Sequence, residues 1–77
     1  MKREEFLNLF TSLLEMEKGA LKGDERLKDI EQWDSLGLIS FIAMLDEHFH
    51  RSLPAQKIQE CRTVNDLMGL VGDQIED

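Results

Sequence analysis

Apolar residues recur along this chain at spacings of three and four, the repeat of a helix that buries one face. The first run predicts a helix from about Arg3 to about Lys18, with Gly19 as its stop. The second run predicts a helix from Asp34, a good N-cap residue, to about His50. The two stripes consist of Phe6, Leu9, Phe10, Leu13 and Leu14, then of Leu38, Phe41, Ile42, Leu45 and Phe49.

The segment between these two helices shows no sustained period, and Gly23-Asp24 at its middle is a turn signal. Loops of this length in compact domains are usually either functional or disordered. Apolar residues recur in this one, which predicts that it is ordered and held against the core at intervals. The expected anchors are Leu21, Leu27, Ile30 and Trp33.

Two shorter helices are predicted after the second stripe. Pro54 at a first helical position opens a short helix over Ala55 to about Glu60. Thr63 is the N-cap of a last helix, with Asp66 three residues on as a weaker relative of the capping box. The last stripe is Val64, Leu67, Met68, Val71 and Ile75, with Gly69 and Gly72 among them. Each of these glycines weakens the helix by roughly 1 kcal/mol relative to alanine, so its end is expected to fray.

Length and composition predict one small all-α domain over residues 1–77. Seventy-seven residues, 42% of them hydrophobic, suffice for a single packed core. The net charge is -7 and the nine Lys and Arg residues are spread along the chain, which argues against nucleic acid and favours a basic protein partner. Cys61 is the single cysteine, and no apolar run reaches the length of a signal segment or membrane span. A cytoplasmic protein with no membrane partner is therefore expected.

A serine stands at the start of the second predicted helix, in the sequence Trp33-Asp34-Ser35-Leu36. A helix N-terminus favours bound phosphate, so Ser35 suits the attachment of a phosphate-linked group. Taken alone, the tripeptide is better explained by ordinary capping, because aspartate and serine both serve as capping residues. Trp33 is expected to anchor the loop.

A catalytic role for Ser35 fails on geometry. The candidate bases, His48 and His50, follow it by thirteen and fifteen residues along one predicted helix. That separation is a rise of about 20 Å, against the roughly 3 Å needed for proton transfer. Two histidines and one cysteine also lack any recognisable metal-ligand spacing. We therefore expect no catalytic residue and no metal site, and we expect both histidines to be solvated.

A second apolar strip, of Leu36, Ile39 and Ala43, lies on a different face of the second predicted helix. The acids Asp46 and Glu47 continue it toward the C-terminal end of the helix. In a plain bundle such a strip is extra core, and in a binding protein it is an exposed docking surface. The pattern alone weighs these two interpretations evenly.

The order of the elements and three short motifs carry a family resemblance over nearly the full chain. The motifs are Asp34-Ser35-Leu36, Asp46-Glu47-His48-Phe49 and Thr63-Val64. Together they resemble the acyl carrier protein family, whose members are four-helix bundles with a long loop between helices one and two and a short third helix. The resemblance implies that Ser35, the serine matched to the motif, bears 4′-phosphopantetheine donated by coenzyme A, with Asp34 and Leu36 beside it.

The resemblance further implies a non-catalytic, monomeric carrier of acyl thioesters in fatty acid, polyketide or another specialised biosynthesis. Its partners would be a phosphopantetheinyl transferase and acyl-loading and acyl-processing enzymes with basic docking patches. The implied docking surface comprises Leu36, Ile39, Ala43, Asp46 and Glu47. Gln32 stands where the family often has glycine, and Gly37 and Ser40 stand where it often has acids, which favours a carrier dedicated to one pathway. An aminoacyl or peptidyl carrier, and an unmodified helical interaction module, are the open alternatives.

Overall fold

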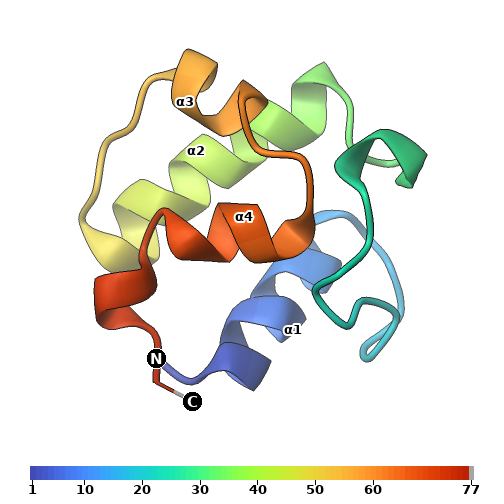
Figure 1. The fold of residues 1–77 in the computed structure, drawn as a ribbon, viewed down its shortest axis with the longest axis horizontal. Helices are drawn as coiled ribbons and strands as arrows, with labels where there is room; N and C mark the ends of the chain where they lie inside the picture. The colour runs from blue at the N-terminus through green and yellow to red at the C-terminus, as the bar shows by residue number, and fades with distance from the viewer. Residues whose placement is uncertain (77) are drawn as a thin grey trace.

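Four α-helices and two 3₁₀ turns make up the protein in a computed structural model that describes residues 1–76 (Figure 1). In chain order they are α1 (Arg3–Leu13), η1 (Leu27–Asp29), α2 (Ser35–Phe49), α3 (Ala55–Gln59), α4 (Val64–Gly69) and η2 (Gly72–Gln74). No strand occurs within the described residues. The predicted all-α architecture is confirmed, including the long connection between α1 and α2 and the short third helix.

An aromatic cluster joins α1 to α2 at the centre of the core. Phe41 of α2 meets both Phe6 and Phe10 of α1 edge to face, with ring centroids 6.3 and 5.6 Å apart. Leu38 and Ile42, two members of the predicted α2 stripe, are only half-buried at the margin of this core. The other buried apolar residues are Leu14, Leu21, Leu27, Ile30, Met44, Leu45, Phe49, Ile58, Val64, Leu67, Met68 and Val71.

Helix α1 ends at Leu13, so the prediction that it reaches Lys18 is wrong. The Met16 N–H donates to the carbonyl of Thr11 at 2.8 Å, which closes the helix and turns the chain away from its axis. Glu15, between these two groups, has φ 59°, in the left-handed region that usually selects glycine at this position. The helix therefore stops at a residue whose type gives no stop signal.

The connection between α1 and α2 lies against the core, as predicted. Leu21, Leu27 and Ile30 are buried, and each belongs to the expected set of anchors. Gly19, which was expected to end α1, lies within this connection with φ +85°. The η1 turn was not predicted, because three residues are too few to produce a hydrophobic period.

The C-terminal helices follow their predicted caps but are short. Pro54 takes the N-cap position of α3 rather than its first helical position. Thr63 caps α4 by accepting a hydrogen bond from the Asp66 N–H at 3.2 Å, and the Asp66 carboxylate accepts one from the Thr63 N–H, so the predicted capping box is confirmed. Helix α4 ends at Gly69, and Gly72 begins η2. The two glycines thus shorten the last helix relative to its apolar stripe.

Candidate functional site

Asp34 fixes the start of α2. Its backbone is extended, and its carboxylate accepts a hydrogen bond from the Gly37 N–H at 3.0 Å. This bond satisfies one of the N–H groups that a helix N-terminus leaves without an intrahelical partner. Asp34 is therefore the N-cap that the sequence predicts, and it sets the direction in which the first turn of α2 presents its side chains.

Ser35 is the first residue of α2, and its side chain is exposed. Among residues 1–76, its hydroxyl has no hydrogen-bond partner, nor have the backbone N–H groups of Ser35 and Leu36. Unpaired N–H groups at a helix N-terminus carry partial positive charge and favour an anion beside them. The position therefore fits a phosphodiester on the Ser35 oxygen, since the hydroxyl is accessible and unpaired donors lie in the same turn.

The site rests on a tightly packed base. The Trp33 ring packs against Phe10 and Phe41, with centroids 5.5 and 5.9 Å away, so the residues immediately before Ser35 are held to the core as predicted. Trp33 itself is half-buried. The loop therefore delivers Ser35 to the surface from a rigid aromatic support rather than from a free segment.

Gly37 has a packing role that its place in the sequence does not reveal. The residue is buried, and a Cβ built on it would lie 3.1 Å from the Gln32 carbonyl oxygen and 3.3 Å from Leu14 Cδ2. Both distances are shorter than ordinary van der Waals contact. The loop and α2 can approach this closely because position 37 has no side chain. An isolated glycine after Asp-Ser-Leu carries no sequence signal for that contact.

The second apolar strip of α2 is exposed. Leu36 and Ile39 are 71% and 63% accessible, and Ala43 is exposed as well. Exposed residues of this kind are not extra core, so that interpretation of the strip is wrong. The acids Asp46 and Glu47 are also exposed at the C-terminal end of the same helix. Helix α2 thus presents an uncovered surface with apolar residues followed by carboxylates.

The remaining candidate groups are the two histidines and the cysteine. His48 and His50 are exposed at the C-terminal end of α2, the end opposite Ser35, and Cys61 is half-buried beyond α3. Within residues 1–76, no three His, Cys, Asp or Glu side chains come close enough together to hold a metal ion.

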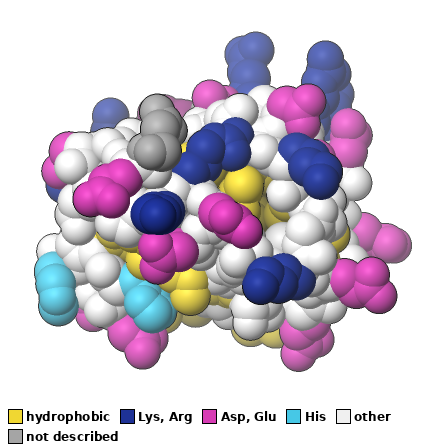
Figure 2. All heavy atoms as spheres, turned by 90° about the horizontal axis from the view of Figure 1, so that it is seen from below, with side chains coloured by type: hydrophobic (Ala, Val, Ile, Leu, Met, Phe, Trp, Pro, Cys, Tyr) yellow, Lys and Arg dark blue, Asp and Glu magenta, His cyan; other side chains and the backbone are white. Residues whose placement is uncertain are grey.

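No helix within residues 1–76 has both the length and the apolar character needed to cross a membrane. On the face seen in Figure 2, Lys and Arg side chains alternate with Asp and Glu rather than forming a basic stripe.

The protein has a small four-helix fold with an exposed serine at the start of its second helix, which is consistent with a helical carrier domain. The family model described as phosphopantetheine attachment site matches residues 4–71 of the 77-residue chain. The protein therefore belongs to the phosphopantetheine attachment site family. No curated protein and no solved structure matches the chain.

Membership of this family defines the cofactor. The domain is a site for the covalent attachment of 4′-phosphopantetheine, which supplies a thiol at the end of a flexible arm, and the chain is a carrier protein. Carrier domains interact with the transferases that modify them and with the enzymes that process their cargo. The matched segment includes the start of α2, with its exposed hydroxyl and unpaired N–H groups.

Proposed function

We propose that this protein is an acyl carrier protein in which Ser35 bears the 4′-phosphopantetheine. The observation that carries the proposal is the exposed Ser35 hydroxyl at the start of α2, without a hydrogen-bond partner among residues 1–76 and inside the segment matched by the family model. Coenzyme A donates the group, and acyl cargo is held as a thioester on the arm. The carrier itself is non-catalytic, monomeric and cytoplasmic.

The chain's own residues support the attachment in simple ways. The Ser35 oxygen forms the new ester bond of the phosphodiester and loses its proton to the modifying enzyme. The pyrophosphate bond of coenzyme A breaks in the same step and releases adenosine 3′,5′-bisphosphate. Asp34 caps α2 and holds Ser35 at its first position, through the bond from the Gly37 N–H. The unpaired N–H groups of Ser35 and Leu36 stabilise the diester's negative charge by roughly 0.3–1 kcal/mol, the usual range for an exposed anion at a helix N-terminus.

The exposed face of α2 is the proposed docking surface for successive enzymes. Leu36, Ile39 and Ala43 supply apolar contact, and Asp46 and Glu47 pair with Lys or Arg side chains of the partner. Pairing between exposed charges makes such docking sensitive to salt. The absence of acids at positions 37 and 40 thins the acidic surface near Ser35, which favours partners dedicated to a single pathway.

Intact-protein mass spectrometry tests the attachment directly. The apo protein is incubated with coenzyme A, magnesium and a promiscuous phosphopantetheinyl transferase, beside Ser35→Ala and Ser40→Ala. Ser40 lies on the same helix and makes no hydrogen bond through its side chain within residues 1–76, so it is a matched control. We expect the wild type and Ser40→Ala to gain one phosphopantetheinyl group and Ser35→Ala to gain none, with all three folded by circular dichroism.

The exposed strip of Leu36 and Ile39 also supports a second candidate, an unmodified helical interaction module that binds a partner helix through α2. Failure of the folded wild type to gain mass would favour that candidate. A mass gain accompanied by loading with an amino acid rather than an acyl group would instead make the protein an aminoacyl or peptidyl carrier.

A further inference from the structure

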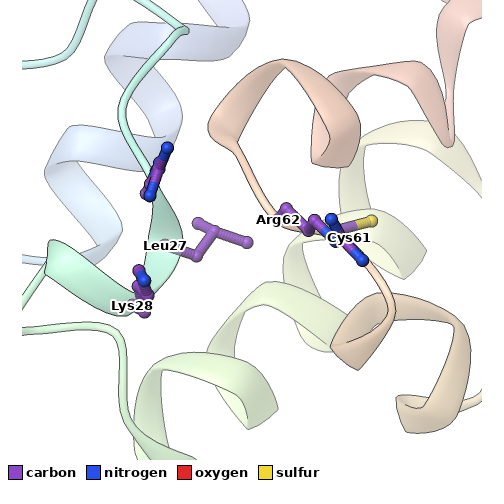
Figure 3. Close-up of a pocket in the computed structure, with 5 residues that line it drawn as sticks. Leu27, Lys28, Cys61 and Arg62 are labelled. Carbon is purple, nitrogen blue, oxygen red and sulfur yellow. The ribbon is translucent and has the colours of Figure 1, made fainter.

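The fold forms a recess lined by basic residues that no pattern in the sequence predicts. Its lining comes from Arg26 and η1 and from the connection between α3 and α4 (Figure 3). The lining residues are Arg26, Leu27, Lys28, Cys61 and Arg62. Three of the nine Lys and Arg residues thus line one recess, although they come from segments more than thirty positions apart. The cations are spread along the chain, and folding brings three of them to the lining of one recess.

The two walls of the recess are fixed to each other by backbone hydrogen bonds. The Leu27 N–H donates to the Arg62 carbonyl at 2.8 Å, within an antiparallel bridge that pairs Arg26 with Thr63. The Arg62 N–H in turn donates to the Asp66 carboxylate at 2.9 Å. These bonds hold the backbone beneath Arg26 and Arg62 in place, so the cations are presented from a preorganised frame rather than from mobile loops.

The recess offers positive charge around an apolar floor. Arg26, Lys28 and Arg62 make no ion pair within residues 1–76, where the one ion pair joins two residues outside the recess. Leu27 is 4% exposed, and in Figure 3 its side chain points from η1 towards the wall that carries Arg62. Burial raises the pKa of the Cys61 thiol, and the carboxylates of Asp66 and Glu60 raise it further, so the thiol itself carries no charge and two acids lie near this side of the recess.

The size of the recess suits a small ligand. Its volume is about 460 Å³, within the range of small-molecule sites, whereas a protein partner generally needs a broad, flatter surface. Asp29 and Glu60 are the exposed acids next to the lining residues in the chain, and Asp66 is engaged by backbone N–H groups. Three cations around a buried leucine favour a small ligand that has an apolar part and an anionic end.

The recess lies within reach of a group attached at Ser35. The Ile30 N–H donates to the Leu27 carbonyl, and the Trp33 N–H donates to the Ile30 carbonyl. Each of these hydrogen-bonded turns keeps its first and last Cα atoms less than about 7 Å apart. Adding the two residues from Trp33 to Ser35, the Cα atoms of Leu27 and Ser35 lie no more than roughly 20 Å apart. An arm of about fourteen bonds spans about 16 Å at the extension of a polypeptide backbone, and a short acyl chain adds several ångströms.

We propose that the recess binds the distal carboxylate of a dicarboxylic acyl group carried on the arm, with the methylene chain of the cargo against Leu27 and the carboxylate between Arg26, Lys28 and Arg62. The proposal rests on the proposed function, because it requires a cargo attached through Ser35. It names a substrate class, dicarboxylic acyl thioesters, which the family assignment leaves open.

The test compares two cargoes of equal length. The apo protein, labelled with ¹⁵N, is loaded by the transferase from glutaryl-coenzyme A or from pentanoyl-coenzyme A, and amide shifts are recorded at low salt. We expect shifts at the amides of Leu27, Lys28 and Arg62 with the glutaryl group only, and their loss at high salt. Equal shifts with both cargoes, or none with either, would overturn the proposal.

Variants of the recess and a control with free ligand test the proposal further. Arg62→Glu should abolish the glutaryl-specific shifts and Arg62→Lys should retain them, while Lys18→Glu, outside the recess and with the same charge change, should leave them intact. Free glutarate at the protein concentration should produce none of them, because tethering supplies the effective concentration. Full shifts with free glutarate would overturn the assignment to tethered cargo. Failure of both cargoes to load would instead count against the attachment itself.

Discussion

The carboxylate of Asp34 accepts a hydrogen bond from the backbone N–H of Gly37 at 3.0 Å, and this bond starts the helix that carries Ser35. Asp34→Ala should lower the free energy of unfolding by about 1 kcal/mol, the usual cost of losing such a cap. Asp34→Asn keeps an acceptor oxygen and should lose far less. Urea denaturation measures both. The exposed Asp46, which makes no side-chain hydrogen bond within residues 1–76, is the control: Asp46→Ala should change stability little.

Gly37 cannot be replaced by an acid without displacing its neighbours. In Gly37→Asp the new Cβ would lie 3.1 Å from the Gln32 carbonyl oxygen, so we expect a loss of roughly 1–3 kcal/mol in the free energy of unfolding. Helix propensity alone would predict a small gain, since aspartate is a better helix residue than glycine. Ala43→Asp, at an exposed position of the same helix, is the control and should cost only about 0.7 kcal/mol, the difference in helix propensity. A neutral Gly37→Asp would contradict the close approach.

Glu15 holds a left-handed conformation that glycine adopts without steric cost. Glu15→Gly should therefore raise the free energy of unfolding, by roughly 0.5–1 kcal/mol after the greater chain entropy of glycine is counted. The change is read from the midpoint of thermal or urea unfolding. Glu17 is exposed and lacks a positive φ, so Glu17→Gly relieves no strain there. This control variant adds only the conformational entropy of glycine in the unfolded chain and should lower the free energy of unfolding.

The capping box of α4 makes part of the stability depend on pH. Hydrogen bonds from the backbone N–H groups of Arg62 and Thr63 lower the pKa of the Asp66 carboxyl below its ordinary value of 3.8. Its folded-state pKa is depressed, so the contribution is present above the unfolded pKa and is lost as the pH falls through the folded value. We expect Asp66→Asn to be less stable than the wild type at pH 7 and to approach it near pH 2. A stability difference that stays constant between these pH values would contradict this assignment.

The acids of α2 should govern docking without affecting the fold. Asp46→Lys with Glu47→Lys should lower the kcat/KM of the transferase for the apo protein, and the wild-type value should fall with added salt while that of the double variant changes less. Glu17→Lys with Glu31→Lys makes the same charge change at exposed residues outside the docking surface and serves as the control. Equal kinetics for the two double variants would remove Asp46 and Glu47 from the docking surface.

The parts of the fold that sequence could predict are those with local signals. The capped starts of α2 and α4, at Asp34 and Thr63, follow from side chains that bond to their own helix. The apolar spacing of α1 and α2 identifies the core residues because burial imposes that period. The serine after Asp34 is a local signal as well, and the family resemblance favours attachment over capping at Ser35.

The parts that sequence missed depend on contacts between distant segments or on conformations that a residue type does not reveal. Glu15 ends α1 although it is not a glycine, and no residue near it signals the stop. The meeting of Arg26 with Arg62 arises only when the backbone of η1 pairs with the strand-like stretch before α4. Likewise, the close approach at Gly37 exists only once the preceding loop has folded onto α2.

The packing of Trp33 also gives the molecule a built-in optical probe. It is the single tryptophan of the chain, half-buried between Phe10 and Phe41 and two positions before Ser35. Its emission therefore reports the polarity of the loop at the attachment site rather than an average over the molecule. A red shift in emission that precedes the loss of helical circular dichroism would show that this loop detaches before the bundle unfolds, and coincident transitions would show that the two melt as one cooperative unit.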